Sequence, residues 1–221
     1  MTESEWQTCT DPQKMLEFLR GKASDRKLRL FTCAYCRHIL QGDKAVQVAE
    51  RIADGLATNA ERKHARKEAV KAATRSRLAG RGGINDLKAV AASAIARILC
   101  PPGRIYRECG TLPGVVVAAV RVVNPQASDD LQQAQAMFLR DIIGSPFCPV
   151  AISPAWLTWN DGTVQKIAQA IYNDRAYDRL PILADALEEA GCTNADILNH
   201  CRQPLEHMRG CWVVDLILGK E

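Results

Sequence analysis

Residues 179–220, RLPILADALEEAGCTNADILNHCRQPLEHMRGCWVVDLILGK, decide the fold class of this chain. Apolar residues recur three and four positions apart, as at Leu183 and Leu187, which is the spacing of an amphipathic helix. Gly191 and Gly219 stand where helices commonly end. The stretch therefore predicts three consecutive helices, at about 178–191, from 193 or 194 onward, and over 205–218.

Helix-start signals continue through the rest of the chain. Thr2 with Glu5 forms a capping-box pattern, and Asp11 followed by Pro12 places proline at a first helical position. Similar patterns predict helices at about 24–40, 43–56, 85–99, 128–144 and from 163. The segment 114–123, GVVVAAVRVV, fits a strand or a short helix, and we favour a helix because no second strand is available to pair with it. The predicted fold class is all-α, an irregular multi-helix bundle of about ten helices with no substantial sheet.

Composition favours a globular protein with one core. The chain has 221 residues, of which 47% are hydrophobic and 24% charged, so it is neither disordered nor too short for a buried core. We predict a single domain over 1–221, with two packed subdomains as the alternative. Gly82-Gly83 and the segment 100–103, Cys-Pro-Pro-Gly, are the predicted hinges.

The sequence also bears on location. No apolar run approaches the ~20 residues that a membrane-spanning helix needs, and the N-terminus is acidic where a signal peptide is basic. The nine cysteines cannot all form disulfides with one another, because an odd number leaves one thiol unpaired. This count favours reduced thiols in a reducing compartment. We therefore predict a cytoplasmic protein without a membrane partner.

Residues 59–81 carry the strongest charge. Eight Lys and Arg stand against Glu61 and Glu68, a net charge of +6 in a chain whose total is +4. The predicted polyanion-binding residues are Arg62, Lys63, Arg66, Lys67, Lys71 and Arg75. Four-residue steps place like charges along one helical stripe, which a nucleic acid or an acidic protein would neutralise. The alternative is a solvated helix or a mobile charged linker over 59–83.

Cysteine and histidine spacing raises a second hypothesis, a metal site. Cys33-Ala-Tyr-Cys36 supplies a C-x-x-C step, although it lies inside a predicted helix. His207 and Cys211, with His200 and Cys201 nearby, supply the other half of a set typical of structural zinc. The predicted ligands are Cys33, Cys36, His207 and Cys211. The alternative is that these side chains are ordinary core residues.

Two further features concern buried or activated groups. His207, Cys211 and Asp215 follow one another at four-residue steps of the predicted last helix. Asp215 is therefore expected to be buried and paired with Arg209, Arg202 or an arginine from another helix. Those three residue types also suit a thiol nucleophile, but a catalytic thiol needs partial exposure.

Cys33 is predicted to lie opposite the apolar face of its helix, near Arg26, Arg29 and Arg37. Three cations would lower the pKa of its thiol. The favoured alternative is that these arginines reach solvent or carboxylates on a neighbouring helix and that Cys33 is incidental.

Several segments resemble a known family. MTESEW (1–6), TDPQKMLEFLRGKASDRKLRLF (10–31), RDIIGSPFCPV (140–150) and HMRGCWVVDLILGK (207–220) are similar to an uncharacterised, multi-copy family of planctomycete bacteria. The resemblance covers both ends, roughly two thirds of the chain, and departs most in the middle. ADALEEAGCTNADILNHCR (184–202) resembles, more weakly, the short helical repeat-companion motif of the same bacteria. Neither group has an established activity, so the resemblance implies a domain and no function.

The sequence contains no catalytic or cofactor motif that assigns a reaction, so we expect a protein that is not an enzyme. The favoured interpretation is an interaction or adaptor module whose basic helix binds an acidic protein or nucleic acid. The alternative is a small zinc-binding or thiol-active protein built on Cys33, Cys36, His207 and Cys211.

Overall fold

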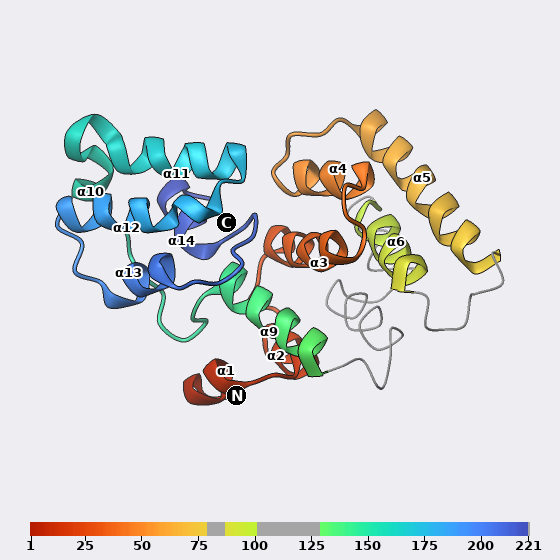
Figure 1. Cartoon of the computed structure of the whole chain (residues 1–221), viewed down its shortest axis with the longest axis horizontal. Helices are drawn as coiled ribbons and strands as arrows, with labels where there is room; N and C mark the ends of the chain where they lie inside the picture. Colours follow the sequence, from red (N-terminus) through yellow and green to blue (C-terminus); the bar gives the residue numbers. More distant parts are fainter. Residues whose placement is uncertain (79–86, 101–128, 221) are drawn as a thin grey trace. The chain divides into compact units, whose positions relative to one another are not determined.

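The computed structural model describes residues 1–78, 87–100 and 129–220. All secondary structure in these ranges is helical, which confirms the all-α prediction (Figure 1). The predicted helix at 114–123, the double-glycine hinge and most of the hinge at 100–103 lie outside the described residues.

The chain divides into two compact units, Met1–Leu139 and Arg140–Glu221. Helix α9 (Asp129–Ile143) crosses this boundary and contributes its last four residues to the C-terminal unit. Whether the units act as one domain, as the sequence favours, stays a prediction.

The N-terminal unit begins with two short capped helices. Its helices before α9 are α1 (Glu3–Thr8), α2 (Pro12–Phe18), α3 (Asp25–Ile39), α4 (Lys44–Ala53), α5 (Asn59–Leu78) and α6 (Leu87–Ile98). The predicted capping box of Thr2 and Glu5 is confirmed, as is the Asp11 cap before Pro12. Side-chain hydrogen bonds of this kind satisfy backbone N–H groups that have no partner within the first helical turn.

Helices α3, α4, α5 and α6 share one hydrophobic core. Alanines face this core from both α5 and α6, including Ala65 and Ala69 on α5 and Ala91 and Ala94 on α6. Small side chains allow two helices to pack closely, and in Figure 1 α5 runs alongside α6. Residues 59–78 of the predicted basic segment are therefore an ordered helix with a buried face.

The arginines of α3 have partners, contrary to a role in activating Cys33. Arg26 pairs with Asp54 at 3.0 Å, and Arg37 binds Glu50 through two nitrogens at 3.2 and 2.8 Å. Cys33 is 1% exposed and belongs to the core, so its predicted place opposite the apolar face is wrong. Burial raises the pKa of its thiol well above the usual value, and the charge of Glu50 adds to this effect, so the lowering by three cations is wrong. The favoured alternative, in which the arginines reach carboxylates on a neighbouring helix, is confirmed for Arg26 and Arg37.

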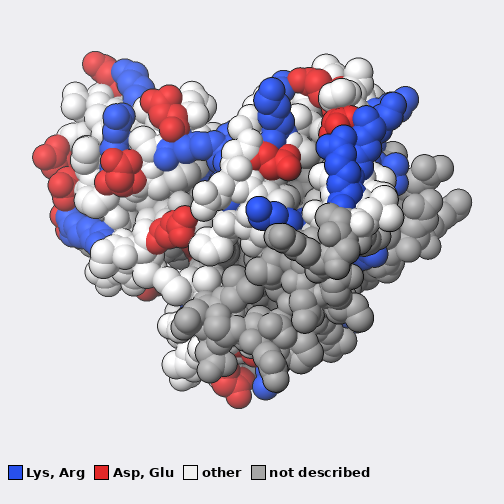
Figure 2. Space-filling view, turned by 45° about the vertical axis from the view of Figure 1, so that its right-hand side comes forward, with Lys and Arg blue, Asp and Glu red and all other residues white. Residues whose placement is uncertain are grey.

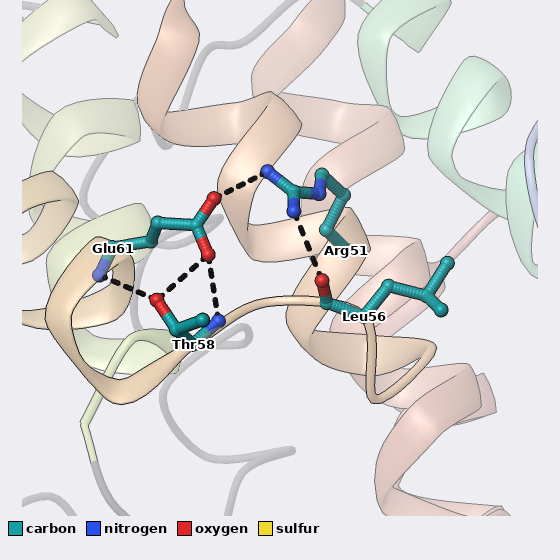
Figure 3. A network of polar contacts seen from close by, with 4 residues as sticks. All are labelled: Arg51, Leu56, Thr58 and Glu61. Carbon is teal, nitrogen blue, oxygen red and sulfur yellow. Dashed lines mark hydrogen bonds and ion pairs between the residues drawn. The ribbon is translucent and has the colours of Figure 1, made fainter.

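A polar network closes the turn between α4 and α5 (Figure 3). Thr58 and Glu61 form a capping box, because the Thr58 N–H donates to Glu61 Oε2 at 2.7 Å and the Glu61 N–H donates to Thr58 Oγ1 at 3.2 Å. Arg51 of α4 bridges to both sides of the turn, through Glu61 Oε1 at 2.6 Å and the Leu56 carbonyl at 2.9 Å. The start of α5 is thereby tied to the end of α4.

The C-terminal unit wraps short helices around a second core. Its elements after α9 are α10 (Pro154–Thr158), η1 (Trp159–Gly162), α11 (Thr163–Asp174), η2 (Tyr177–Arg179), α12 (Leu180–Glu189), α13 (Ala195–Arg202) and α14 (Trp212–Leu218). Helix α11 packs against α12 and α14, and α12 packs against α13. Buried aliphatic residues such as Val164, Leu183 and Val214 fill the space between them.

The last helix is shorter than the sequence predicts. It begins at Trp212 rather than near 205, because Gly210 has a φ of 99° and the N-cap Cys211 is non-helical with a ψ of 126°. His207 and Cys211 therefore precede the helix, and the prediction that they occupy one helical face with Asp215 is wrong. Among the described helices, none is both long and apolar enough to cross a membrane.

Candidate metal centre

Asp141 lies in the last turn of α9, one turn before the chain turns at Gly144 with a φ of 71°. Its side chain is buried, and one carboxylate oxygen, Oδ2, accepts a hydrogen bond from the backbone N–H of Met208 at 2.8 Å. The other oxygen, Oδ1, is directed to two histidines. The hydrogen bond to Oδ2 holds the carboxylate so that Oδ1 faces both histidines.

His207 comes from the loop between α13 and α14. Its Nδ1 lies 2.6 Å from Asp141 Oδ1, and its Nε2 lies 3.4 Å from the Gln203 carbonyl. Because the Gln203 carbonyl and the Asp141 carboxylate both only accept, the first contact calls for a proton on Nε2 and the second for a proton on Nδ1. Hydrogen bonds of this type orient a histidine so that its other nitrogen faces a ligand.

His200 and Cys211 complete the group. His200, on α13, places Nε2 3.2 Å from Asp141 Oδ1 and 3.2 Å from the Sγ of Cys211. The rings of His200 and His207 meet edge to face with their centroids 4.8 Å apart. One potential ligand atom from each of Asp141, His200, His207 and Cys211 lies within 4.8 Å of the other three.

The pKa values of Asp141 and Cys211 shift in opposite directions. Burial acts to raise the pKa of Asp141, but hydrogen bonds with His200 and His207 outweigh it and hold that pKa below its usual value. Burial raises the pKa of the Cys211 thiol well above the usual value, and the charge of Asp141 raises it further. Without a cation the group therefore holds a carboxylate beside a neutral thiol.

This arrangement does not suit a nucleophilic thiol. In a catalytic triad one histidine nitrogen faces the nucleophile and the other faces the carboxylate. Here the same atom, His200 Nε2, faces both Cys211 and Asp141. The convergence of oxygen, nitrogen and sulfur atoms on one small volume, in buried surroundings, is a group that could hold a metal ion.

The neighbouring residues restrict the position of His200. The ring centroid of Trp212 lies 5.2 Å from that of His200. A Cβ added at Gly144 would lie 2.9 Å from Cγ of the Trp212 ring. Glycine at 144 thus allows both the positive φ and the close approach of the indole.

The structure assembles only part of the predicted metal set. His207 and Cys211 belong to the group, together with Asp141 and His200. Cys33 and Cys36 lie on α3 in the N-terminal unit, where Cys36 Sγ is 3.5 Å from the Ala91 carbonyl and both thiols are buried in the core. Burial raises the pKa of Cys36 as well, which suits a core thiol.

Sequence reasoning missed Asp141. It lies 59 positions before His200 in an apolar helix end, and no local pattern links the two residues. The only available signal was a single acidic residue in the last turn, where the helix dipole disfavours negative charge unless a partner compensates it.

Asp215 is buried on α14, as predicted, with 1% of its surface exposed. Asp215 takes part in an interaction with another group. That the partner of its carboxylate is an arginine stays a prediction.

No protein-family model matches the chain, and neither the curated proteins nor the solved structures contain a match. The resemblance to the planctomycete family stays a prediction.

Proposed function

We propose that the C-terminal unit binds one Zn²⁺ through Asp141, His200, His207 and Cys211, and that the ion acts as a structural cross-link. The observation that carries the proposal is the approach of four potential ligand atoms to within 4.8 Å of one another. They come from the end of α9, from α13, from the loop after it and from the N-cap of α14. A cation here would join segments that are far apart in sequence.

The donor set favours zinc over other common cations. Thiolate, imidazole and carboxylate are all zinc ligands, whereas Ca²⁺ and Mg²⁺ prefer oxygen ligands. Tetrahedral zinc separates its ligand atoms by ~3.3 to 3.8 Å. The two 3.2 Å separations at His200 Nε2 are close to that range, and the 2.6 Å contact of His207 with Asp141 would open by ~0.7 Å when the ion replaces a proton.

Four protein ligands and burial support a structural role rather than a catalytic one. Catalytic zinc usually has three protein ligands and an open position for water. The proposed location is the cytoplasm, where the eight free cysteines in the described part of the chain would stay reduced. The protein is thus proposed as a zinc-stabilised binding protein without an enzymatic activity.

Metal content tests the proposal directly. Protein purified without chelator is expected to contain about one zinc per chain by mass spectrometry, and Asp141→Asn or His200→Gln should lower that content. Cys201→Ser is the matched control, because Cys201 is a buried cysteine on α13 beside His200 but is not part of the group. It should retain the zinc.

A titration guards against loss of metal during purification or misfolding of a variant. Parent protein freed of metal should bind one equivalent of Co²⁺ and develop the absorption of a cobalt–thiolate bond, which Cys211→Ser should abolish. Parent protein that neither contains zinc nor takes up Co²⁺ would overturn the proposal and leave the group as a hydrogen-bond network.

A further inference from the structure

Two arginines of α5 contact the end of helix α6, whereas other cations of α5 are exposed. Arg62 donates to the Leu99 carbonyl at 3.3 Å and to Asn59 Oδ1, and Arg66 Nε lies 3.2 Å from Cys100 Sγ. Both arginines thus contact the C-terminal end of α6, where cations offset the helix dipole. They are structural, although the sequence groups them with the polyanion-binding residues.

Four other cations of α5, Lys63, Lys67, Lys71 and Arg75, are exposed. Lys63, Lys67 and Arg75 are exposed, and no hydrogen bond or ion pair to them occurs within the described part of the chain. Lys71, also exposed, pairs with Glu68 at 2.8 Å. Figure 2 shows Lys and Arg side chains clustered in the upper right of the view, in the region of α5.

The spacing of these cations matches an extended polyanion. Residues four apart on a helix lie on one face, so Lys63, Lys67, Lys71 and Arg75 form a row ~18 Å long. Like charges at this spacing repel one another and slightly destabilise the helix. Lys71 pairs with Glu68, whereas Lys63, Lys67 and Arg75 make no hydrogen bond or ion pair among the described residues and are available to an anionic ligand.

We propose that this row, the α5 cation row, binds the phosphate backbone of double-stranded nucleic acid. A duplex carries one negative charge per ~1.7 Å of its axis, so a helix lying along it meets phosphates over its whole length. Each neutralised phosphate releases condensed counterions, which supplies the binding free energy. The contacts carry no base information, so binding is independent of sequence.

Other polyanions fit the row less well. Single strands are usually bound by stacking of bases on aromatic side chains, and α5 contains no Phe, Tyr or Trp. A protein interface usually has an apolar centre with aromatic anchors. The large apolar side chains described as exposed on α5 are Val70 and Leu78, and neither is aromatic.

The test compares three exposed cations on the row with three elsewhere. Binding of a fluorescent 20-base-pair duplex to the 221-residue chain is measured by anisotropy between 50 and 200 mM salt. The variant Lys63→Gln/Lys67→Gln/Arg75→Gln should reduce the slope of log affinity against log salt concentration by about 2.7. The loss of affinity between 50 and 200 mM salt should then be about 40-fold smaller than in the parent. Arg20→Gln/Lys44→Gln/Lys166→Gln removes the same charge from exposed sites outside α5 and should change the slope little.

Two further measurements separate binding from folding and from the choice of partner. The row variant should melt at or slightly above the parent temperature because like-charge repulsion is relieved, and Lys63→Arg/Lys67→Arg should retain binding. An unchanged slope in the row variant, or an equal loss in the control, would overturn the proposal. Displacement of the duplex by poly-glutamate at a lower charge concentration would overturn it in favour of an acidic protein.

Discussion

Cys36 and Cys211 are both fully buried thiols, yet only Cys211 lies against a histidine and belongs to the group of potential metal ligands. Cys36→Ser should destabilise the protein because a hydroxyl replaces sulfur in an apolar core. Cys211→Ser should do so by removing a zinc ligand.

Chelator separates the two effects in thermal melts of zinc-loaded protein. It should lower the melting temperature of the parent and of Cys36→Ser by similar amounts, because independent changes add. It should have little effect on Cys211→Ser. Equal chelator sensitivity of both variants would contradict a ligand role for Cys211.

Asp215 provides a second prediction about a single residue. Its side chain is buried, and Asp215→Ala would leave the predicted arginine partner of its carboxylate without a counter-charge. We expect a loss of ~3 to 5 kcal/mol in the free energy of unfolding if the partner is an arginine. Asp185→Ala, which removes an exposed pair with Arg202, should lose no more than ~1 kcal/mol. Denaturant unfolding measures both, and equal small losses would argue against a buried ion pair.

At the scale of elements, the capping box of α5 makes stability depend on pH. Hydrogen bonds from the Thr58 backbone and side chain, and then from Arg51, lower the pKa of Glu61 to about 2. Since the unfolded pKa is ~4.3, the ionised side chain stabilises the fold above that pH and the contribution is lost as pH falls toward 2.

Glu61→Gln should therefore be less stable than the parent near pH 6, with the difference disappearing near pH 2. Thr58→Ala should cost ~0.5 to 2 kcal/mol at neutral pH, the usual range for loss of an N-cap. Glu189→Gln, at an exposed position without such a box, is the control. A difference that persists unchanged at pH 2 would contradict the capping explanation.

Element prediction succeeded where the signals are local. The caps at Thr2, Asp11, Ser24 and Asp43 all form, because each depends on residues two or three positions away. The start of α14 was misplaced because the apolar run and the His207–Cys211–Asp215 spacing outweighed Gly210, whose positive φ ends any continuous helix. Half of the candidate metal site was found from residue type, namely His207 and Cys211. Asp141 could not be found, because its role depends on how α9 packs against a distant loop.

At the scale of the whole molecule, two compact units with separate cores predict two responses to metal removal. Calorimetry of zinc-loaded protein should show a transition of the C-terminal unit that chelator lowers. A transition of the N-terminal unit should stay unchanged, since its core contains none of the four ligands. Zinc binding raises the stability of the folded state that holds it. A single transition that moves as a whole would show instead that the units unfold cooperatively.

The contact of Trp212 with His200 makes the candidate centre optically accessible. The indole lies 5.2 Å, centroid to centroid, from a ring that would bind the ion, whereas the chain has three other tryptophans, at 6, 156 and 159. A paramagnetic ion such as Co²⁺ at His200 would quench the emission of its nearest indole most strongly, while Zn²⁺ would shift that emission without quenching. A Trp212→Phe variant would remove most of this response, so the protein carries its own fluorescent reporter of occupancy.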